Sequence, residues 1–138
     1  MDRITETFLS EKPDQGDKTI LIVEDEVIML RLLEKFFSRH GYNVLVATDG
    51  EQAVEIYRSH MRQIDVVLLD MRLPKIMGGE VFRLLKNENP AVKVVMASGF
   101  LEPEVKIEMA VAGAKRFVNK PYNLVELLEI FQSVIDDE

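Results

Sequence analysis

Short apolar runs alternate along the chain with segments in which apolar residues recur every three or four positions. The runs have the composition of buried strands, and the intervening segments have the spacing of helices with one apolar face. Five runs are expected to form strands: TILIVED (19–25), YNVLVAT (42–48), DVVLLD (65–70), VKVVMASG (92–99) and KRFVNK (115–120). The sequence therefore predicts five strand–helix units in strict alternation.

Turn formers and capping residues mark the ends of the predicted helices. Asp49 precedes Gln52 by three residues, and Asn123 precedes Glu126 by three, which is the spacing of a capping box. Gly41 is expected to end the first helix, because glycine readily adopts the left-handed conformation that follows many helices. One face of this first helix is expected to carry Val27, Leu30, Leu33 and Phe37. The later helices are expected at about 49–61, 79–89, 103–113 and from 123 onward.

Strict alternation of strands and helices is typical of a parallel sheet covered by helices on both faces. Strands buried on both faces read as continuous apolar runs, as these do. The predicted fold class is α/β, with a doubly wound, five-stranded parallel sheet of the flavodoxin-like type. Ligands of such sheets bind outside the carboxyl ends of the strands, so the residues there are the first functional candidates.

Length and composition narrow the classes of protein. The chain has 138 residues and is 47% hydrophobic and 30% charged, which is ordinary for one globular domain. Residues 1–18 are rich in charge and turn formers and are expected to form a flexible tail, with the domain at 19–138. The absence of cysteine excludes disulfides, thiolate metal sites and a cysteine nucleophile.

Charge and hydropathy bear on partners and location. The formal net charge of −7 argues against direct binding of nucleic acid, because phosphate backbones require a basic surface. No apolar run approaches the roughly 18 residues of a membrane span, so no membrane partner is expected. The N-terminus has no apolar signal-peptide core, and a cytoplasmic location is the expectation.

Polar residues stand at four of the five strand ends. The first strand ends in Glu24 and Asp25, the third in Asp70, and Ser98 and Lys120 end the fourth and fifth. Three clustered carboxylates repel one another unless a cation is present, and hard oxygen ligands without histidine favour Mg²⁺. Three negative charges are balanced by Mg²⁺ and one lysine. A phosphoryl group could then bind between the metal, the hydroxyl and the lysine, as phosphoryl transfer requires.

Each of these residues also has an ordinary structural interpretation. An aspartate at a strand end is usually a turn former or helix cap, a lysine before proline is usually a solvated charge, and Ser98–Gly99 alone would be a turn. Their occurrence together, at four strand ends of one sheet, favours a functional site.

Four segments carry a family resemblance: LIVEDE (21–26), LLDMRLPKIMGGE (68–80), VMASG (95–99) and FVNKP (117–121). In this order and spacing the chain resembles the receiver domain of response regulators in two-component signalling, the CheY-like superfamily. The resemblance implies the strand order 2-1-3-4-5 and a switch that catalyses its own aspartyl phosphorylation and dephosphorylation, rather than an enzyme acting on another substrate. The implied partners are a histidine kinase or histidine phosphotransfer protein and an unidentified downstream protein.

The resemblance also implies roles for individual residues. Asp70 would accept the phosphoryl group, and Mg²⁺ would be held by Asp70, by Asp25, by Glu24 directly or through water, and by the backbone carbonyl of Arg72. Glu24 departs from the family pattern, in which aspartate is more common, and its longer side chain puts the metal geometry in question.

Ser98 and Lys120 would bind the phosphoryl oxygens in the same resemblance. Phe117, three residues before Lys120, matches the aromatic switch position whose rotamer follows the Ser98 hydroxyl. Phe117 has the alternative interpretation of an ordinary core aromatic, and the sequence does not separate the two.

Several functional alternatives stay open at this point. A single-domain regulator is favoured over a receiver excised from a hybrid histidine kinase. A degenerate receiver that serves only as an interaction module is a further alternative, against which the intact Asp25, Asp70, Ser98 and Lys120 argue. A flavodoxin-like cofactor binder is disfavoured, because the loop after the first strand is acidic and would repel a phosphate.

Overall fold

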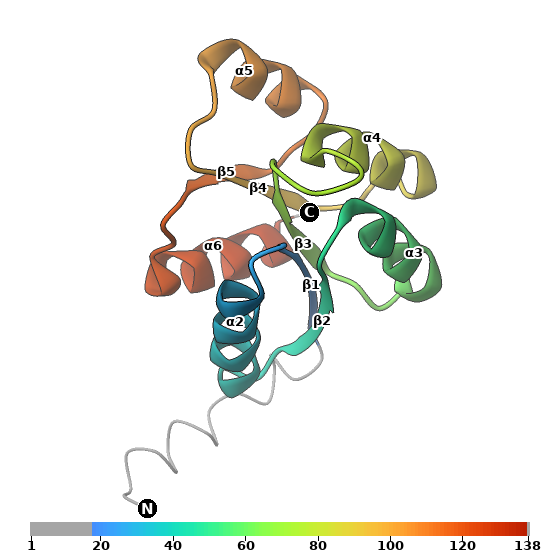
Figure 1. The fold of residues 1–138 in the computed structure, drawn as a ribbon. Helices are drawn as coiled ribbons and strands as arrows, with labels where there is room; N and C mark the ends of the chain where they lie inside the picture. Colours follow the sequence, from blue (N-terminus) through green and yellow to red (C-terminus); the bar gives the residue numbers. More distant parts are fainter. Residues whose placement is uncertain (1–17, 138) are drawn as a thin grey trace, which may run out of the picture.

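The computed structural model describes residues 18–137, so the predicted flexible tail at 1–18 lies outside the described residues apart from Lys18. Ten elements follow in strict alternation (Figure 1). They are β1 (Thr19–Val23), α2 (Val27–Arg39), β2 (Asn43–Ala47), α3 (Gly50–His60), β3 (Val66–Asp70), α4 (Gly78–Glu88), β4 (Val94–Ser98), α5 (Pro103–Val111), β5 (Arg116–Asn119) and α6 (Leu124–Asp136).

The five strands form one parallel sheet with the order β2-β1-β3-β4-β5. β1 is the second strand in this order: β2 forms the edge on one side of it, and β3, β4 and β5 follow on the other side. This order confirms the predicted doubly wound fold. It also brings the carboxyl ends of β1 and β3 side by side, because these strands are direct neighbours.

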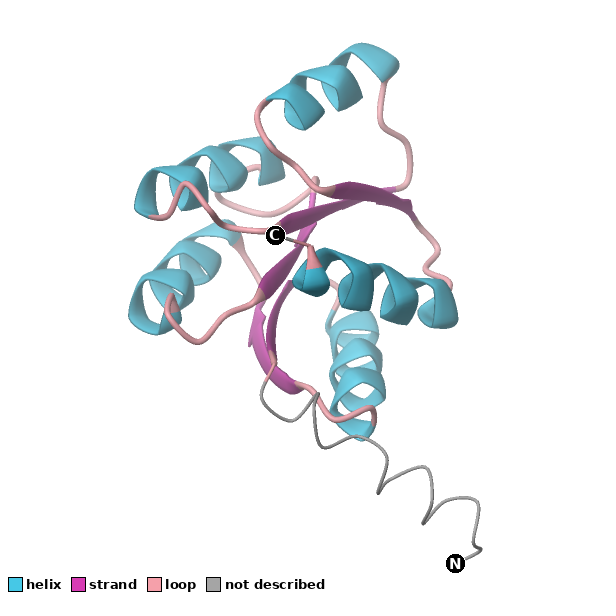
Figure 2. Cartoon of the chain, turned by 180° about the vertical axis from the view of Figure 1, so that it is seen from behind, coloured by secondary structure: helices cyan, strands magenta, loops and turns pink. Residues whose placement is uncertain are grey.

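Helices cover both faces of the sheet, and each face carries its own apolar cluster (Figure 2). Successive side chains of a strand point to opposite faces, so Leu21 and Val23 pack beneath α3 and α4, whereas Ile20 and Ile22 pack beneath α2 and α6. The central strands β1, β3 and β4 are buried at every position. The apolar runs in the sequence are continuous for this reason.

The helix ends largely follow the predicted signals. Asp49 Oδ1 accepts a hydrogen bond from the Gln52 amide at 2.8 Å, and Asn123 Oδ1 accepts one from the Glu126 amide at 3.0 Å. Gly41, just beyond α2, has a φ of +92°, which an L side chain rarely adopts. Both predicted N-caps and the predicted glycine stop are therefore confirmed.

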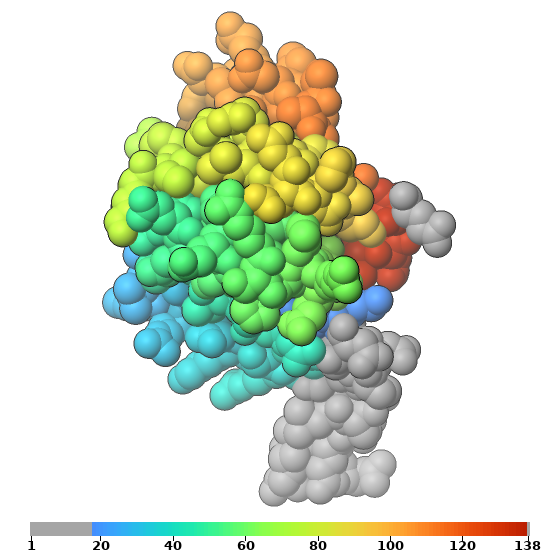
Figure 3. Space-filling model, turned by 90° about the vertical axis from the view of Figure 1, so that its right-hand side faces the viewer, coloured from blue at the N-terminus to red at the C-terminus, as the bar shows by residue number. Residues whose placement is uncertain are grey.

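Helix α5 differs from the others because none of its nine residues is buried. In the space-filling view the orange atoms of this segment stand out at one end of the molecule (Figure 3). Among the described residues, no helix is both long and apolar enough to span a membrane.

Candidate functional site

The carboxyl ends of the strands form a rim with an open cavity of 580 Å³. Residues at or just beyond the ends of β1, β3, β4 and β5 line it, namely Asp25, Glu26, Asp70, Arg72, Gly99, Phe100 and Lys120. The parallel order of the sheet explains this convergence, since all four strands run toward the same edge. The predicted candidates at the ends of β1, β3 and β5 therefore meet in one place, and Ser98 ends the neighbouring β4.

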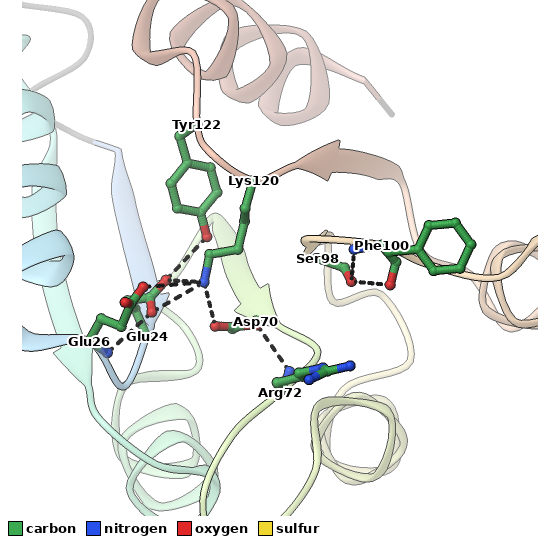
Figure 4. A network of polar contacts seen from close by, with 8 residues as sticks. All are labelled: Glu24, Glu26, Asp70, Arg72, Ser98, Phe100, Lys120 and Tyr122. Atoms are coloured by element: carbon green, nitrogen blue, oxygen red, sulfur yellow. Dashed lines mark hydrogen bonds and ion pairs between the residues drawn. The ribbon is translucent and has the colours of Figure 1, made fainter.

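Glu24 is completely buried although it is a carboxylate. Its Oε1 atom lies 3.2 Å from the Lys120 ammonium and accepts a hydrogen bond from the Tyr122 hydroxyl at 3.3 Å. Its Oε2 atom accepts a hydrogen bond from the Glu26 amide at 3.2 Å and lies 3.4 Å from Lys120 Nζ. The donors to Glu24 therefore come from the loop after β1 and from the segment after β5 (Figure 4).

Asp70 is 3% exposed and is also held at both carboxylate oxygens. Oδ2 accepts a hydrogen bond from Lys120 Nζ at 2.9 Å, and Oδ1 accepts one from the Arg72 amide at 3.0 Å. Lys120 therefore bridges Asp70 and Glu24 (Figure 4). The Lys120–Pro121 peptide bond that follows is cis.

Glu24, Asp25 and Asp70 are close enough to share one cation. Each offers a carboxylate oxygen, and these three atoms lie within 4.8 Å of one another. Asp25 is exposed, whereas the other two are buried. A cluster of carboxylates without a histidine or cysteine ligand suits a hard divalent cation such as Mg²⁺. The chemistry of the donor set thus fits Mg²⁺.

Burial and charge act against each other at this cluster. Burial raises the pKa of the Glu24 carboxyl above its ordinary value, and the charge of Asp70 adds to this, although the Glu26 amide and Lys120 oppose it. Burial also disfavours the charge on Lys120, but its bonds to Asp70 and Glu24 outweigh burial and raise its pKa. Lys120 therefore stays an ammonium and holds the two acids together.

Ser98 is present at the rim but does not join this network. Its hydroxyl donates a hydrogen bond to the Phe100 carbonyl at 2.7 Å and accepts one from the Phe100 amide at 3.1 Å. Figure 4 shows this pair set apart from Lys120 and Asp70. The Lys120 amide does donate to the Ser98 carbonyl at 2.9 Å, so the two strand ends are joined through their backbones.

Phe117 lies on the edge strand β5 and is half-buried. It is opposite Met96 in the register, and Asn119 is opposite Ser98. The alternation of side chains places Ser98 and Phe117 on the sheet face that carries α3 and α4. The Lys106 ammonium of α5 lies 5.5 Å from the centre of the Phe117 ring. This position suits both a core aromatic and a switch, so the predicted role stays a prediction.

Two groups that hold Glu24, the Tyr122 hydroxyl and the Glu26 amide, were not predicted from the sequence. Tyr122 follows Lys120 by two residues, and that spacing was an available signal because the whole segment leaves β5 at the rim. A hydroxyl contact across 98 positions of sequence was not available from pattern alone.

Comparison with known proteins establishes the family. Residues 20–132 match the response regulator receiver domain, so the chain belongs to that family. It is 30% identical to the chemotaxis protein CheY of Thermotoga maritima over 118 residues, which cover 85% of this chain and 97% of that protein. The chain is a receiver domain of two-component signalling, and such domains are signalling switches.

A relative of known structure shares the fold and has the same sequence identity to this chain as the Thermotoga CheY. A chain of the crystal structure of the CheX–CheY–BeF3–Mg²⁺ complex from Borrelia burgdorferi has a TM-score of 0.82 and 30% identity, with 87% of this chain and 90% of that chain covered. Other relatives are longer. The chain spans 29% of a cyclic di-GMP phosphodiesterase of Thermotoga maritima, at 37% identity over 112 residues, and 47% of response regulator GtcR of Aneurinibacillus migulanus.

Proposed function

We propose that the chain takes a phosphoryl group from a phosphohistidine onto Asp70, with Mg²⁺, and thereby switches a protein-interaction surface. The observation that carries the proposal is the Lys120 ammonium, which is 2.9 Å from Asp70 and 3.2 Å from Glu24 at the rim of the sheet. A buried aspartate with a lysine at its carboxylate and two further acids beside it has the charges that phosphoryl transfer needs.

Four groups would hold the metal: the carboxylates of Glu24, Asp25 and Asp70 and the backbone carbonyl of Arg72. The three carboxylates support this assignment because their oxygens lie within 4.8 Å of one another. When bound, Mg²⁺ supplies positive charge that offsets the charge of the incoming phosphoryl oxygens. The residues that are buried, Glu24 and Asp70, would give the site its fixed geometry.

The chain's own residues would perform the transfer. A carboxylate oxygen of Asp70 attacks phosphorus, the bond from phosphorus to the donor imidazole nitrogen breaks, and that nitrogen keeps the electron pair. Lys120 then binds a phosphoryl oxygen, since its ammonium is already at Asp70 Oδ2. Ser98 donates its hydroxyl to another oxygen. Hydrolysis of the aspartyl phosphate by water would return the domain to its starting state.

The switch would begin with Ser98. Its hydroxyl is bound to the Phe100 backbone and must leave that partner in order to reach a phosphoryl group on Asp70. Such a movement would shift the loop 99–102 toward the site. Phe117, on the same sheet face, would follow the displaced loop and change the surface formed by α5, β5 and α6.

The partners proposed are a histidine kinase or histidine phosphotransfer protein upstream and a protein of unknown identity downstream. A single-domain regulator is favoured, with a receiver from a hybrid histidine kinase as the alternative. The organisation as a tail at 1–18 and a domain at 19–138, the cytoplasmic location and the expectation of no nucleic-acid or membrane partner stay predictions.

Intact mass spectrometry after incubation with acetyl phosphate tests this function. The parent is expected to gain one phosphoryl group in the presence of Mg²⁺ and none in its absence, and Asp70→Asn is expected to gain none. Asp65→Asn is the matched control, because Asp65 lies at the other end of β3 and accepts a hydrogen bond from the Thr19 amide. Equal phosphorylation of the Asp70→Asn variant would overturn the assignment, and no adduct on a folded parent would indicate an interaction module only.

A further inference from the structure

Three groups donate hydrogen bonds to the buried Glu24 carboxylate: the Tyr122 hydroxyl, the Glu26 amide and the Lys120 ammonium. A carboxylate has about four lone-pair positions, two on each oxygen. Tyr122 Oη and Lys120 Nζ contact Oε1, and the Glu26 amide and Lys120 Nζ contact Oε2. Hydrogen bonds fill three of these positions, and Lys120 Nζ also lies 3.2 Å from Oε1, so a cation that binds Glu24 competes with this ammonium.

The contacts of Glu24 differ in how easily they can be replaced. Lys120 is a flexible side chain with a second carboxylate partner, Asp70, at 2.9 Å. Tyr122 is a ring that packs against the apolar cluster beneath α2 and α6, and the Glu26 amide belongs to the backbone. Lys120 is thus the contact that a cation would replace, and Tyr122 and Glu26 are the contacts that would remain.

We propose that Tyr122 is a positioning residue of the metal site: its hydroxyl fixes the orientation of the Glu24 carboxylate and so raises the affinity for Mg²⁺. This inference rests on the proposed metal site. Partners that hold a metal ligand in orientation commonly contribute about tenfold or more to metal affinity. A tyrosine hydroxyl is protonated at neutral pH, so Tyr122 donates a hydrogen bond to Glu24 Oε1 at 3.3 Å.

The length of Glu24 makes the proposal specific to this chain. An aspartate at this position would be shorter by one carbon–carbon bond, about 1.5 Å. The 3.3 Å contact from Tyr122 would then lengthen beyond hydrogen-bond distance. The tyrosine hydroxyl and the glutamate are therefore expected to act as a pair, and removing either should remove the contribution of the other.

Isothermal titration calorimetry of the unphosphorylated protein with Mg²⁺ tests the pair. Tyr122→Phe is expected to weaken Mg²⁺ binding about tenfold in the parent. The same substitution in a Glu24→Asp background is expected to leave the affinity unchanged. Tyr57→Phe is the matched control: it removes a tyrosine hydroxyl that accepts a hydrogen bond from Asn89 at 3.0 Å, away from the rim, and should leave Mg²⁺ affinity unchanged.

A second measurement needs only the parent. In NMR spectra the ring signals of Tyr122 are expected to shift as Mg²⁺ is added, with the same dissociation constant as the Asp25 amide, while those of Tyr57 do not move. Three results would each overturn this inference but not the proposed metal site. They are equal Mg²⁺ affinity of the parent and Tyr122→Phe, an equal loss of Mg²⁺ affinity in the parent and Glu24→Asp backgrounds, and Tyr122 ring signals that do not shift. A parent that binds no Mg²⁺ would overturn the proposed metal site and this inference with it.

Discussion

Two loops leave the same rim of the sheet, and they are built in opposite ways. The loop from Asp70 to Gly78 closes on itself, with the Gly78 amide donating to the Met71 carbonyl at 3.0 Å and no room for a side chain at Gly78. The loop after Ser98 is open: a side chain at Gly99 would meet nothing within 4 Å, and the Phe100 side chain is 74% exposed.

The difference matches the proposed tasks of the two strand ends. Asp70 must be held still, because a nucleophile gains most of its rate from positioning. Ser98 must move, because its hydroxyl is bound to the Phe100 backbone in this state. In the proposed switch the loop after Asp70 is the fixed one and the loop after Ser98 the movable one, and each loop can be tested separately.

The largest expected effect is at the closed loop. A Cβ atom at Gly78 would lie 2.6 Å from the Met71 Cα atom, and backbone cannot yield cheaply. Gly78→Ala is expected to lower the free energy of unfolding by about 3 kcal/mol, measured by urea denaturation. Gly79→Ala, with nothing within 4 Å, is the control and should change it by less than about 1 kcal/mol.

The open loop provides the counterpart to this substitution. Gly99→Ala is expected to stay within about 0.5 kcal/mol of the parent. A large loss at Gly99, or none at Gly78, would contradict the contrast between the two loops.

Removal of the bridging ammonium is expected to have the next largest effect. Lys120→Met leaves Asp70 and Glu24 without their shared cation, and one donor to a phosphoryl oxygen is lost. Phosphoryl uptake from acetyl phosphate is expected to slow about hundredfold. Lys115→Met, at the other end of β5 and paired with Asp137, should retain the parent rate. A fast Lys120→Met variant would remove the lysine from the mechanism.

A smaller effect is expected for Ser98→Ala. The hydroxyl brings no positive charge to the phosphoryl oxygens, unlike the Lys120 ammonium, so uptake should slow only about tenfold. Stability should hardly change, because within residues 18–137 the hydroxyl bonds to the Phe100 backbone of its own loop. Ser98→Thr keeps the hydroxyl and is expected to restore the rate, measured by the same mass assay. Parent-like uptake by Ser98→Ala would show that the open loop does not serve the transfer.

The smallest expected effect is the pH dependence of stability at Glu24. Burial raises the pKa of this carboxyl in the folded state, so the folded protein holds its proton more tightly than the unfolded chain. Glu24 therefore favours folding below its ordinary pKa of 4.5, and this contribution is lost as pH rises through the raised value.

Glu24→Gln removes that titration. Without Mg²⁺, the variant is expected to gain stability relative to the parent as pH rises from about 4 to about 7, in paired urea denaturation curves. A difference that is independent of pH would contradict the assigned direction of the shift. Glu80→Gln, an exposed acid paired with Arg83, provides a comparison away from the rim.

The sequence was sufficient for the architecture and for most of the rim. Alternating apolar runs determine a parallel sheet, and parallel strands bring Glu24, Asp70 and Lys120 to one edge whatever the details of packing. The hydrogen-bond partners of the Ser98 and Tyr122 hydroxyls, by contrast, can be identified only from the three-dimensional structure. Ser98 binds its own loop, and the Tyr122 hydroxyl reaches Glu24 because the chain turns back after β5.

The helical spacing of apolar residues also does not tell which other elements pack against the apolar face of a helix. Val27 shares the stripe of Leu30 and Leu33, yet it is 55% exposed because α2 begins directly at the rim. In α5 the residues Ile107 and Val111 are apolar and exposed, because no element within residues 18–137 covers them. Burial depends on neighbours that come from distant parts of the chain.

A crystal structure with beryllofluoride and Mg²⁺ would test the contrast between the two loops most directly, since beryllofluoride on an aspartate mimics the aspartyl phosphate. The account predicts an unchanged backbone from Asp70 to Gly78, with the Ser98 hydroxyl turned from the Phe100 backbone to the bound group. A structure in which Ser98 keeps its bonds to Phe100 while the loop after Asp70 rearranges would contradict it.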